Sequence, residues 1–212
     1  MTARTYLTVR GHAEAEIEAK RSRFLCRVEH AADEAAARAV VDRARTQHWD
    51  ARHHVSAFVL GPDRGVQRSS DDGEPSGTAG MPVLDVLRGR ELTDVVAVVT
   101  RWFGGTLLGA GGLVRAYSDA ARLALESATL VTRELLLLGE VEVDHADAGR
   151  VEHELRSRGV VVRDTAYASR ATVLVGVRPE ELEAARGWVR AATHGRADLL
   201  LTDEAWVDAG SA

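Results

Sequence analysis

Two glycine-rich segments in the first half of the sequence contain most of the residue types that could do chemistry. The first, Ser69 to Gly80, combines three carboxylates, four hydroxyls and three glycines. Its hydroxyls can cap backbone amides, and its carboxylates suit a hard cation such as magnesium or an arginine. Because Asp, Ser and Gly also dominate turns, spacing alone favours a capped turn over a metal site. The candidate binding residues here are Ser70, Asp71, Asp72, Glu74, Ser76 and Thr78.

The second segment, Arg101 to Gly112, follows a predicted buried strand and precedes a predicted helix. This arrangement can direct backbone amides and the positive end of a helix at an anion, and the alternative is close packing that needs glycine for space. It is neither a Walker A loop nor the dinucleotide fingerprint, because the residues after Gly109 match neither pattern. The candidate anion-binding residues are Arg101, Gly104, Gly105, Gly109, Gly111, Gly112 and Arg115. We expect the two segments to converge in space, with Arg101 and Arg115 facing the first segment and compensating Asp71 or Asp72.

Two adjacent histidines precede a predicted strand, where neighbouring side chains point to opposite faces. At most one of them, with His53 as the candidate, can therefore reach a site shared with the two segments, and a His53–His54 metal pair is not expected. A serine hydrolase would need a base and an orienting acid, and the sequence has no G-x-S-x-G elbow. We assign no catalytic residue, no metal ligand and no cofactor.

The overall composition is that of a globular protein, with 212 residues of which 45% are hydrophobic. Apolar runs such as Leu135 to Leu138 are far too short for a membrane span, and Met1 to Gly11 lacks the apolar core of a signal peptide. A cytoplasmic location is expected, with no membrane partner. The single cysteine, Cys26, excludes internal disulfides and is predicted to be a packed, buried residue.

The net charge of -5 comes from the second part of the chain. Residues 1–131 carry 17 cationic and 17 anionic residues, whereas residues 132–212 carry 10 and 15. Neither part has the basic excess of a protein that binds nucleic acid through phosphate charge alone. We therefore expect no DNA partner, and any RNA binding must be local.

Hydrophobic periodicity predicts an α+β protein with two domains, 1–131 and 132–212. In the first domain we expect one or two strands over 15–28, around Lys20 to Arg23, and a helix from an Asp33 N-cap to about Trp49. Further along we expect strands over 55–60 and 66–69, a helix from Thr78 or Gly80 to Gly89, a strand over 95–100 and a helix after the second glycine segment. The boundary is expected at 129–134, as a loosely packed connection.

In the second domain the pattern predicts strands over 135–143, 160–167, 171–177 and 198–207, with helices over 145–158 and 179–193. The order βαββαβ is that of a ferredoxin-like domain. Its central strands, 135–143 and 170–177, have no aromatic residues, so it is not a standard RNA-recognition sheet.

The two glycine-rich segments, at this separation, closely resemble the IMPACT/YigZ family. Ser22 to Phe24, Ala51 to Ala57, Ser69 to Gly80 and Val99 to Tyr117 follow that family's order, and the match covers about residues 10 to 205. The resemblance implies a βαβ-rich amino-terminal domain with the fold of a ribosomal small-subunit protein and of domain IV of elongation factor G, followed by a ferredoxin-like domain. Two departures are Val55, where a cysteine is frequent, and Met81, where a basic residue is frequent.

The sequence is compatible with three hypotheses about function, of which the first is preferred. The first is a non-enzymatic regulator associated with translation, which binds RNA, the ribosome or a translation factor through the glycine-rich surface of the first domain. The second is a magnesium-assisted enzyme acting on a phosphorylated small molecule, with Asp71 and Asp72 around the cation. The third is a protein-interaction adaptor. The sequence leaves the oligomeric state open.

Overall fold

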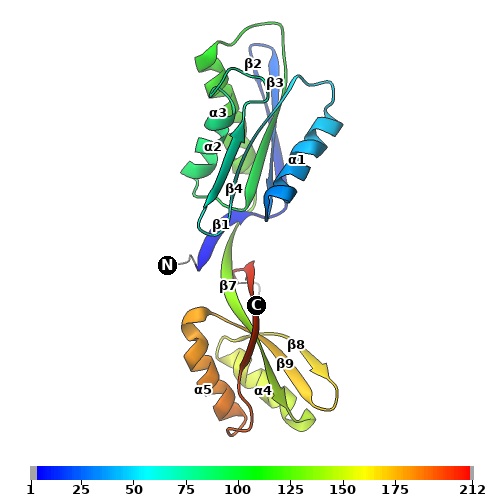
Figure 1. The fold of residues 1–212 in the computed structure, drawn as a ribbon, viewed down its shortest axis with the longest axis vertical. Helices are drawn as coiled ribbons and strands as arrows, with labels where there is room; N and C mark the ends of the chain where they lie inside the picture. The colour runs from blue at the N-terminus through cyan, green and yellow to red at the C-terminus, as the bar shows by residue number, and fades with distance from the viewer. Residues whose placement is uncertain (1–3, 211–212) are drawn as a thin grey trace. The chain divides into compact units, whose positions relative to one another are not determined.

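The computed structural model describes residues 4–210 and divides into two compact units between Thr132 and Arg133 (Figure 1). Each unit packs helices against a β-sheet, so the predicted α+β class is confirmed. Within the described residues, none of the helices is both long and apolar enough to cross a membrane.

The first unit is a sheet with helices on both faces (Figure 1). Its elements are β1 (Thr5–Val9), β2 (His12–Ala19), β3 (Ser22–His30), α1 (Glu34–Gln47), β4 (His53–Leu60), β5 (Val66–Ser70), α2 (Gly80–Gly89), β6 (Val95–Trp102) and α3 (Ala110–Ser127). The sheet has the strand order β2-β3-β6-β4-β5, and all neighbours in it are antiparallel. Helix α1 covers one face, and α2 and α3 cover the other.

Alternation along the central strands decides which residues meet which helices. On β4, Val55, Ala57 and Val59 pack in the core under α2 and α3, whereas Phe58 and Leu60 pack under α1. Because both faces are covered, β4 and β6 are apolar on both sides and almost fully buried. This alternation also determines the side of the sheet on which each polar residue at the strand ends lies.

Most predicted elements of the first unit are confirmed within a few residues. Asp33 caps α1, accepting a hydrogen bond from the amide of Ala36 at 2.7 Å, and α2 runs from Gly80 to Gly89. Cys26 is fully buried, and burial raises the pKa of its thiol well above the usual range. Strand β1 was not predicted; its Val9 belongs to the core under α2 and α3.

The second unit contains the predicted order of elements. They are β7 (Leu130–Val143), α4 (His145–Ser157), β8 (Val161–Tyr167), β9 (Ala171–Val177), a 3₁₀ turn (Pro179–Glu181), α5 (Leu182–Ala192) and β10 (Leu200–Asp208). β7 pairs antiparallel with β9 and β10, and β8 pairs with β9, which is the strand order of a split βαβ domain. Both helices contribute to one core with β7 and β9.

The connection expected at 129–134 is not a loose linker. Helix α3 ends at Ser127, and β7 begins at Leu130 and continues through the division without a break. Arg133 and Glu134 are already paired with Asp208 and Val207 of β10. The prediction of a loosely packed segment is wrong because the apolar residues after Ala128 extend a strand that the sequence pattern indicated only from Leu135.

Candidate functional site

The site is built on a row of residues across three neighbouring strands. Phe24 of β3 lies opposite Arg101 of β6, which in turn lies opposite His53 of β4. Residues directly opposite one another in antiparallel strands share a face. The alternation along each strand puts all three on the face covered by α2 and α3, because Cys26, Val55 and Val99 belong to that core.

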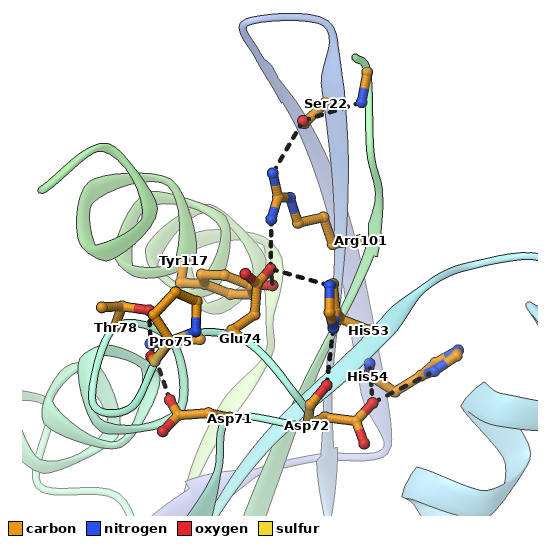
Figure 2. Close-up of polar contacts among 12 residues, drawn as sticks. Ser22, His53, His54, Asp71, Asp72, Glu74, Pro75, Thr78, Arg101 and Tyr117 are labelled. Carbon is orange, nitrogen blue, oxygen red and sulfur yellow. Dashed lines mark hydrogen bonds and ion pairs between the residues drawn. The ribbon is translucent and has the colours of Figure 1, made fainter. Parts of the chain in front are cut away.

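Glu74 connects this row to the first glycine-rich segment. One of its carboxylate oxygens, Oε1, accepts hydrogen bonds from Arg101 Nη1 at 2.6 Å and from Tyr117 Oη at 2.7 Å (Figure 2). Arg101 Nη2 donates to Ser22 Oγ at 3.3 Å. We call Ser22, His53, Glu74, Arg101 and Tyr117 the Glu74 cluster. Ser22 and Arg101, 79 positions apart in the sequence, thus meet. The pairing of Glu74 with Arg101 brings the two glycine-rich segments together, so their predicted convergence is confirmed.

The cluster is almost completely removed from water. The side chains of Arg101 and Glu74 are 6% and 4% exposed, and Tyr117 is fully buried. Burial and the adjacent Glu74 carboxylate raise the pKa of Tyr117 above its usual range, so the phenol stays protonated and donates. The buried Arg101–Glu74 pair, with the hydrogen bond from Tyr117, therefore fixes the position of Glu74 relative to β6 and α3. It does not leave the Arg101 charge free for a ligand.

His53 also belongs to the cluster, but as a support for the loop. Its Nδ1 lies 2.8 Å from the carbonyl oxygen of Asp72, which can only accept, so Nδ1 carries the proton. Its Nε2 lies 3.9 Å from Glu74 Oε1, beyond hydrogen-bond distance. His54 lies on the opposite face, where its Nε2 is 3.2 Å from the carbonyl oxygen of His48. The prediction that only one histidine reaches the site is confirmed.

Asp71 caps the start of α2. Its two carboxylate oxygens accept hydrogen bonds from the amides of Gly77 and Gly80 at 2.8 Å and of Ala79 at 3.1 Å. Burial raises the pKa of this carboxyl, but the three amides outweigh burial and lower it below its usual value. The capped-turn interpretation therefore describes Asp71.

Asp72 points away from Asp71, towards α1 (Figure 2). Its Oδ1 accepts from Arg45 Nη2 at 2.8 Å, and its Oδ2 accepts from the amide of His54 at 2.6 Å. Asp72 has a φ of +44°, and the next residue, Gly73, has a φ of +85°. This turn sends the side chains of Asp72 and Glu74 to different faces of the sheet. No shared cation position is formed by the two aspartates.

The second glycine-rich segment rests on the hairpin between β2 and β3. The amide of Gly104 donates to Ser22 Oγ at 3.2 Å, and a Cβ on Gly104 would lie 2.0 Å from the backbone carbonyl of Arg21. Glycine is needed here for close approach, as the packing interpretation predicted. Gly105 and Gly109 have positive φ, and Gly109 precedes α3, whose start has no side-chain cap. Gly111 is exposed and Gly112 half-buried in the first turn of α3.

Two expectations about the arginines are corrected. Arg101 was expected to compensate Asp71 or Asp72, whereas its partner is Glu74. Arg115 was expected to do the same, but it is exposed on α3 and forms no hydrogen bond or ion pair with any described residue. It lies in the second turn of α3, which begins at Ala110.

The remaining candidates of the first segment differ in accessibility. Thr78 is buried and donates its hydroxyl to the carbonyl of Pro75 at 2.6 Å. Ser70 Oγ accepts from the amide of Asp72 at 3.3 Å, and Ser76 is exposed. No three His, Cys, Asp or Glu side chains among residues 4–210 form a group suited to a metal ion. Hydrogen bonds of Asp71 to the backbone order the segment, and Glu74 extends from it to Arg101.

Around the cluster lies a set of residues that the sequence interpretation missed. Lys20 and Arg21 form the tip of the β2–β3 hairpin, and Lys20 Nζ lies 3.5 Å from the carbonyl of Leu107. The guanidinium of Arg52 lies 5.8 Å from the ring of Phe103, which is 40% exposed. We call Lys20, Arg21, Arg52 and Phe103 the cationic rim. A signal was present, since a Lys-Arg pair between two strand patterns indicates a charged hairpin tip.

Comparison with known proteins agrees with this architecture. The Impact N-terminal domain matches residues 20–125, and a domain of unknown function, DUF1949, matches residues 141–196. The fold and the first-unit loops thus define a two-unit protein with an IMPACT-type first domain. The chain belongs to the IMPACT family.

Three relatives show the extent of the similarity. The IMPACT family member YvyE of Bacillus subtilis is 38% identical over 195 residues, covering 92% of this chain and 90% of that protein. An IMPACT family member of Haemophilus influenzae is 34% identical over 203 residues, covering 93% and 97%. The IMPACT family member YigZ of Escherichia coli is 48% identical over 114 residues, covering 53% and 56%.

A solved structure also resembles the whole chain. A crystal structure described as that of a hypothetical protein has a TM-score of 0.67 and 31% sequence identity, and the similarity covers 94% of this chain and 98% of that one. The two-unit architecture is therefore shared with a protein whose structure is known.

Proposed function

We propose that this chain is a non-enzymatic regulator associated with translation, and that it binds single-stranded RNA, alone or on the ribosome, through the cationic rim. Membership of the IMPACT family supports a translation-related regulatory role at the level of the family. The proposal includes a cytoplasmic location and the finer fold likeness of the first unit to a ribosomal small-subunit protein and domain IV of elongation factor G.

The observation that carries the proposal is the hairpin tip. Ala19 pairs with Ser22, so Lys20 and Arg21 form a two-residue turn, and both have positive φ, 47° and 65°. Such a turn favours Asn-Gly, because Gly and Asn tolerate the left-handed region whereas most other residues with a Cβ are strained there. Here two exposed cations occupy both strained positions. A function for the charges explains why the chain accepts this strain.

The surroundings of the tip fit RNA better than a small molecule. The side chains of Arg21 and Arg52 are exposed and have no hydrogen-bond or ion-pair partner in residues 4–210. Phe103 offers an exposed ring beside Arg52, and bases stack on such rings while cations contact phosphates. The uncapped amides at the start of α3 add donors for an anion at the end of the same glycine-rich segment.

The enzyme hypothesis has no observation in its favour. Its proposed magnesium ligands, Asp71 and Asp72, are engaged by backbone amides and by Arg45, and they point in different directions. His53, the nearest titratable base, holds the loop through Nδ1. A general base has to be within hydrogen-bond reach of the proton it removes, and the Nε2 of His53, which has no hydrogen-bond partner among the described residues, lies 3.9 Å from the buried carboxylate of Glu74.

The proposal is tested by fluorescence anisotropy with a labelled, unstructured RNA of mixed sequence. We expect Arg52→Ala and Phe103→Ala each to weaken binding about five- to tenfold, from one lost phosphate contact or one lost stacked base. The matched control is Arg163→Ala, an exposed arginine on β8. If Arg163→Ala weakens binding as much as Arg52→Ala, the binding is non-specific and the rim is not the site. If wild-type protein binds no RNA, the proposal is wrong.

A further inference from the structure

A second surface of the first unit has the composition of an anion site. It is a groove of about 330 Å³ between α1 and the edge strand β5. Three arginines, Arg38, Arg45 and Arg68, and three serines, Ser56, Ser69 and Ser70, contribute to its lining. None of these residues except Ser70 was among the candidates from the sequence. The groove lies on the α1 face, opposite the face that holds the Glu74 cluster.

Strand pairing explains how the donors converge. Ser56 lies opposite Ser70 and Phe58 lies opposite Arg68, so these four residues share one face of the β4–β5 pair. Phe58 belongs to the core under α1, which identifies this face as the one that α1 covers. Helix α1 supplies Arg38 and Arg45 from the facing side. Two elements therefore place positive charge on opposite walls of one small groove.

The floor of the groove contains a polar group without a partner. Ser56 is only 9% exposed, and its hydroxyl forms no hydrogen bond within the described part of the chain. This hydroxyl is not fully buried, so it can meet a water or a ligand atom that enters the groove. The Arg68 side chain is exposed and also has no hydrogen-bond or ion-pair partner among residues 4–210.

The lining of the groove has more hydrogen-bond donors than acceptors. Asp42 is the one carboxylate that lines the groove. Arg38 and Arg45 each have a single acidic partner outside the lining, Glu34 at 3.2 Å and Asp72 at 2.8 Å. A guanidinium has five N–H donors, so each of these arginines keeps donors for a further acceptor. The groove thus presents many donors and few acceptors.

We propose that this groove binds a small phosphate monoester. The terminal phosphate would accept from Arg68, Arg45 and the Ser56 hydroxyl, because a dianionic phosphate has three oxygens able to take several charge-assisted hydrogen bonds. Val41 and Phe58 also line the groove and suit an apolar organic group. A volume of about 330 Å³ is within the range of small-molecule sites and too small for a folded nucleic acid.

The test is a ¹H–¹⁵N NMR titration of the full chain with inorganic phosphate and with phenyl phosphate. We expect saturable shifts of the amides of Ser56, Arg68, Ser69 and Ser70, and tighter binding of phenyl phosphate because its ring contacts the apolar wall. Arg68→Ala should weaken phenyl phosphate about tenfold, and Ser56→Ala about three- to fivefold, as lost hydrogen bonds to a charged group.

Arg90→Ala is the matched control, since Arg90 is an exposed arginine at the end of α2, away from the groove. It should leave phenyl phosphate affinity unchanged. The rim variant Arg52→Ala should also leave it unchanged, so failure of the RNA proposal does not affect this one. The proposal is overturned if Arg68→Ala and Ser56→Ala bind like wild type, if Arg90→Ala weakens binding equally, or if the shifts lie at the start of α3 instead of the groove.

Discussion

Replacing Lys20 with Asn and Arg21 with Gly should make the protein more stable and a poorer RNA binder. The two residues have φ of 47° and 65°, in the left-handed region where Asn and Gly are tolerated. Lys20 makes only one long contact, 3.5 Å to the carbonyl of Leu107, and Arg21 makes no side-chain hydrogen bond or ion pair with the described residues. Little is therefore lost from the folded state when their side chains are removed.

The expected gain follows from two opposing effects. Relief of left-handed strain is worth roughly 1 to 2 kcal/mol for each residue with a Cβ. Glycine also gives the unfolded chain more freedom, which costs about 0.4 to 1 kcal/mol, and Asn relieves only part of the strain. The double variant should thus gain about 1 kcal/mol in free energy of unfolding. Loss of two cations from the rim should reduce the slope of log K against log salt by about 1.4 for single-stranded RNA.

Urea unfolding monitored by circular dichroism measures the stability, and anisotropy between low and high salt measures the binding. Arg64→Gly is the matched control, because Arg64 is another exposed, non-glycine residue with positive φ, 58°, in the turn before β5. It should stabilise the protein without changing RNA affinity. A double variant that is less stable than wild type would refute the strain argument. One that is more stable but binds RNA with the wild-type salt slope would refute the role of the tip.

Three further predictions concern the loop and its supports. Glu74→Ala should lower the free energy of unfolding by about 3 to 5 kcal/mol in urea, because it leaves the Arg101 charge and the Tyr117 hydroxyl buried without their acceptor; a loss under about 1 kcal/mol would contradict this. Gly104→Ala should destabilise by roughly 1 to 3 kcal/mol and shift the amide signals of Arg21, since the added Cβ overlaps the Arg21 carbonyl. The folded state lowers the pKa of Asp71, so its carboxylate adds to the free energy of unfolding above the unfolded pKa of about 3.9. This contribution is lost as the pH falls through the lower pKa of the folded state. An Asp71→Asn variant should therefore lose less stability than wild type between about pH 4 and 2 in acid unfolding.

Much of the fold followed from local patterns. Asp33 predicted the start of α1, and Gly89 predicted the end of α2. Both signals are local, because residues that cap or stop a helix act on neighbouring backbone groups. The opposite orientation of His53 and His54 followed from strand alternation alone. Strand β1 escaped prediction because Thr5–Val9 is short and its burial depends on partners far along the chain.

The partner of Arg101 could not be predicted in the same way. Three carboxylates lie within four residues of the loop, and local sequence does not say which one turns inward. The outcome depends on the positive φ of Asp72 and Gly73, which rotates Glu74 towards β6 and Asp72 towards α1. Likewise, the groove needs the register that places Ser56 opposite Ser70 and Phe58 opposite Arg68, and register is a tertiary property.

The different roles of the adjacent aspartates link the two faces of the sheet. The backbone carbonyl of Asp72 holds His53 on the face of the Glu74 cluster, while its carboxylate holds Arg45 on the face of the groove. Arg45 is therefore shared between the loop and any anion in the groove, and a bound phosphate must compete with Asp72 for one of its N–H groups or use the others. Asp71 fixes the other side of the same turn by accepting hydrogen bonds from three backbone amides. The loop is thus held by the Asp71 contacts on one side and by the Asp72–Arg45 pair, for which a ligand can compete, on the other. A ligand that weakened the Arg45–Asp72 pair would thus first change the positions of Asp72 and of His53, which is hydrogen-bonded to the Asp72 carbonyl. The start of α2, which Asp71 holds, would stay in place.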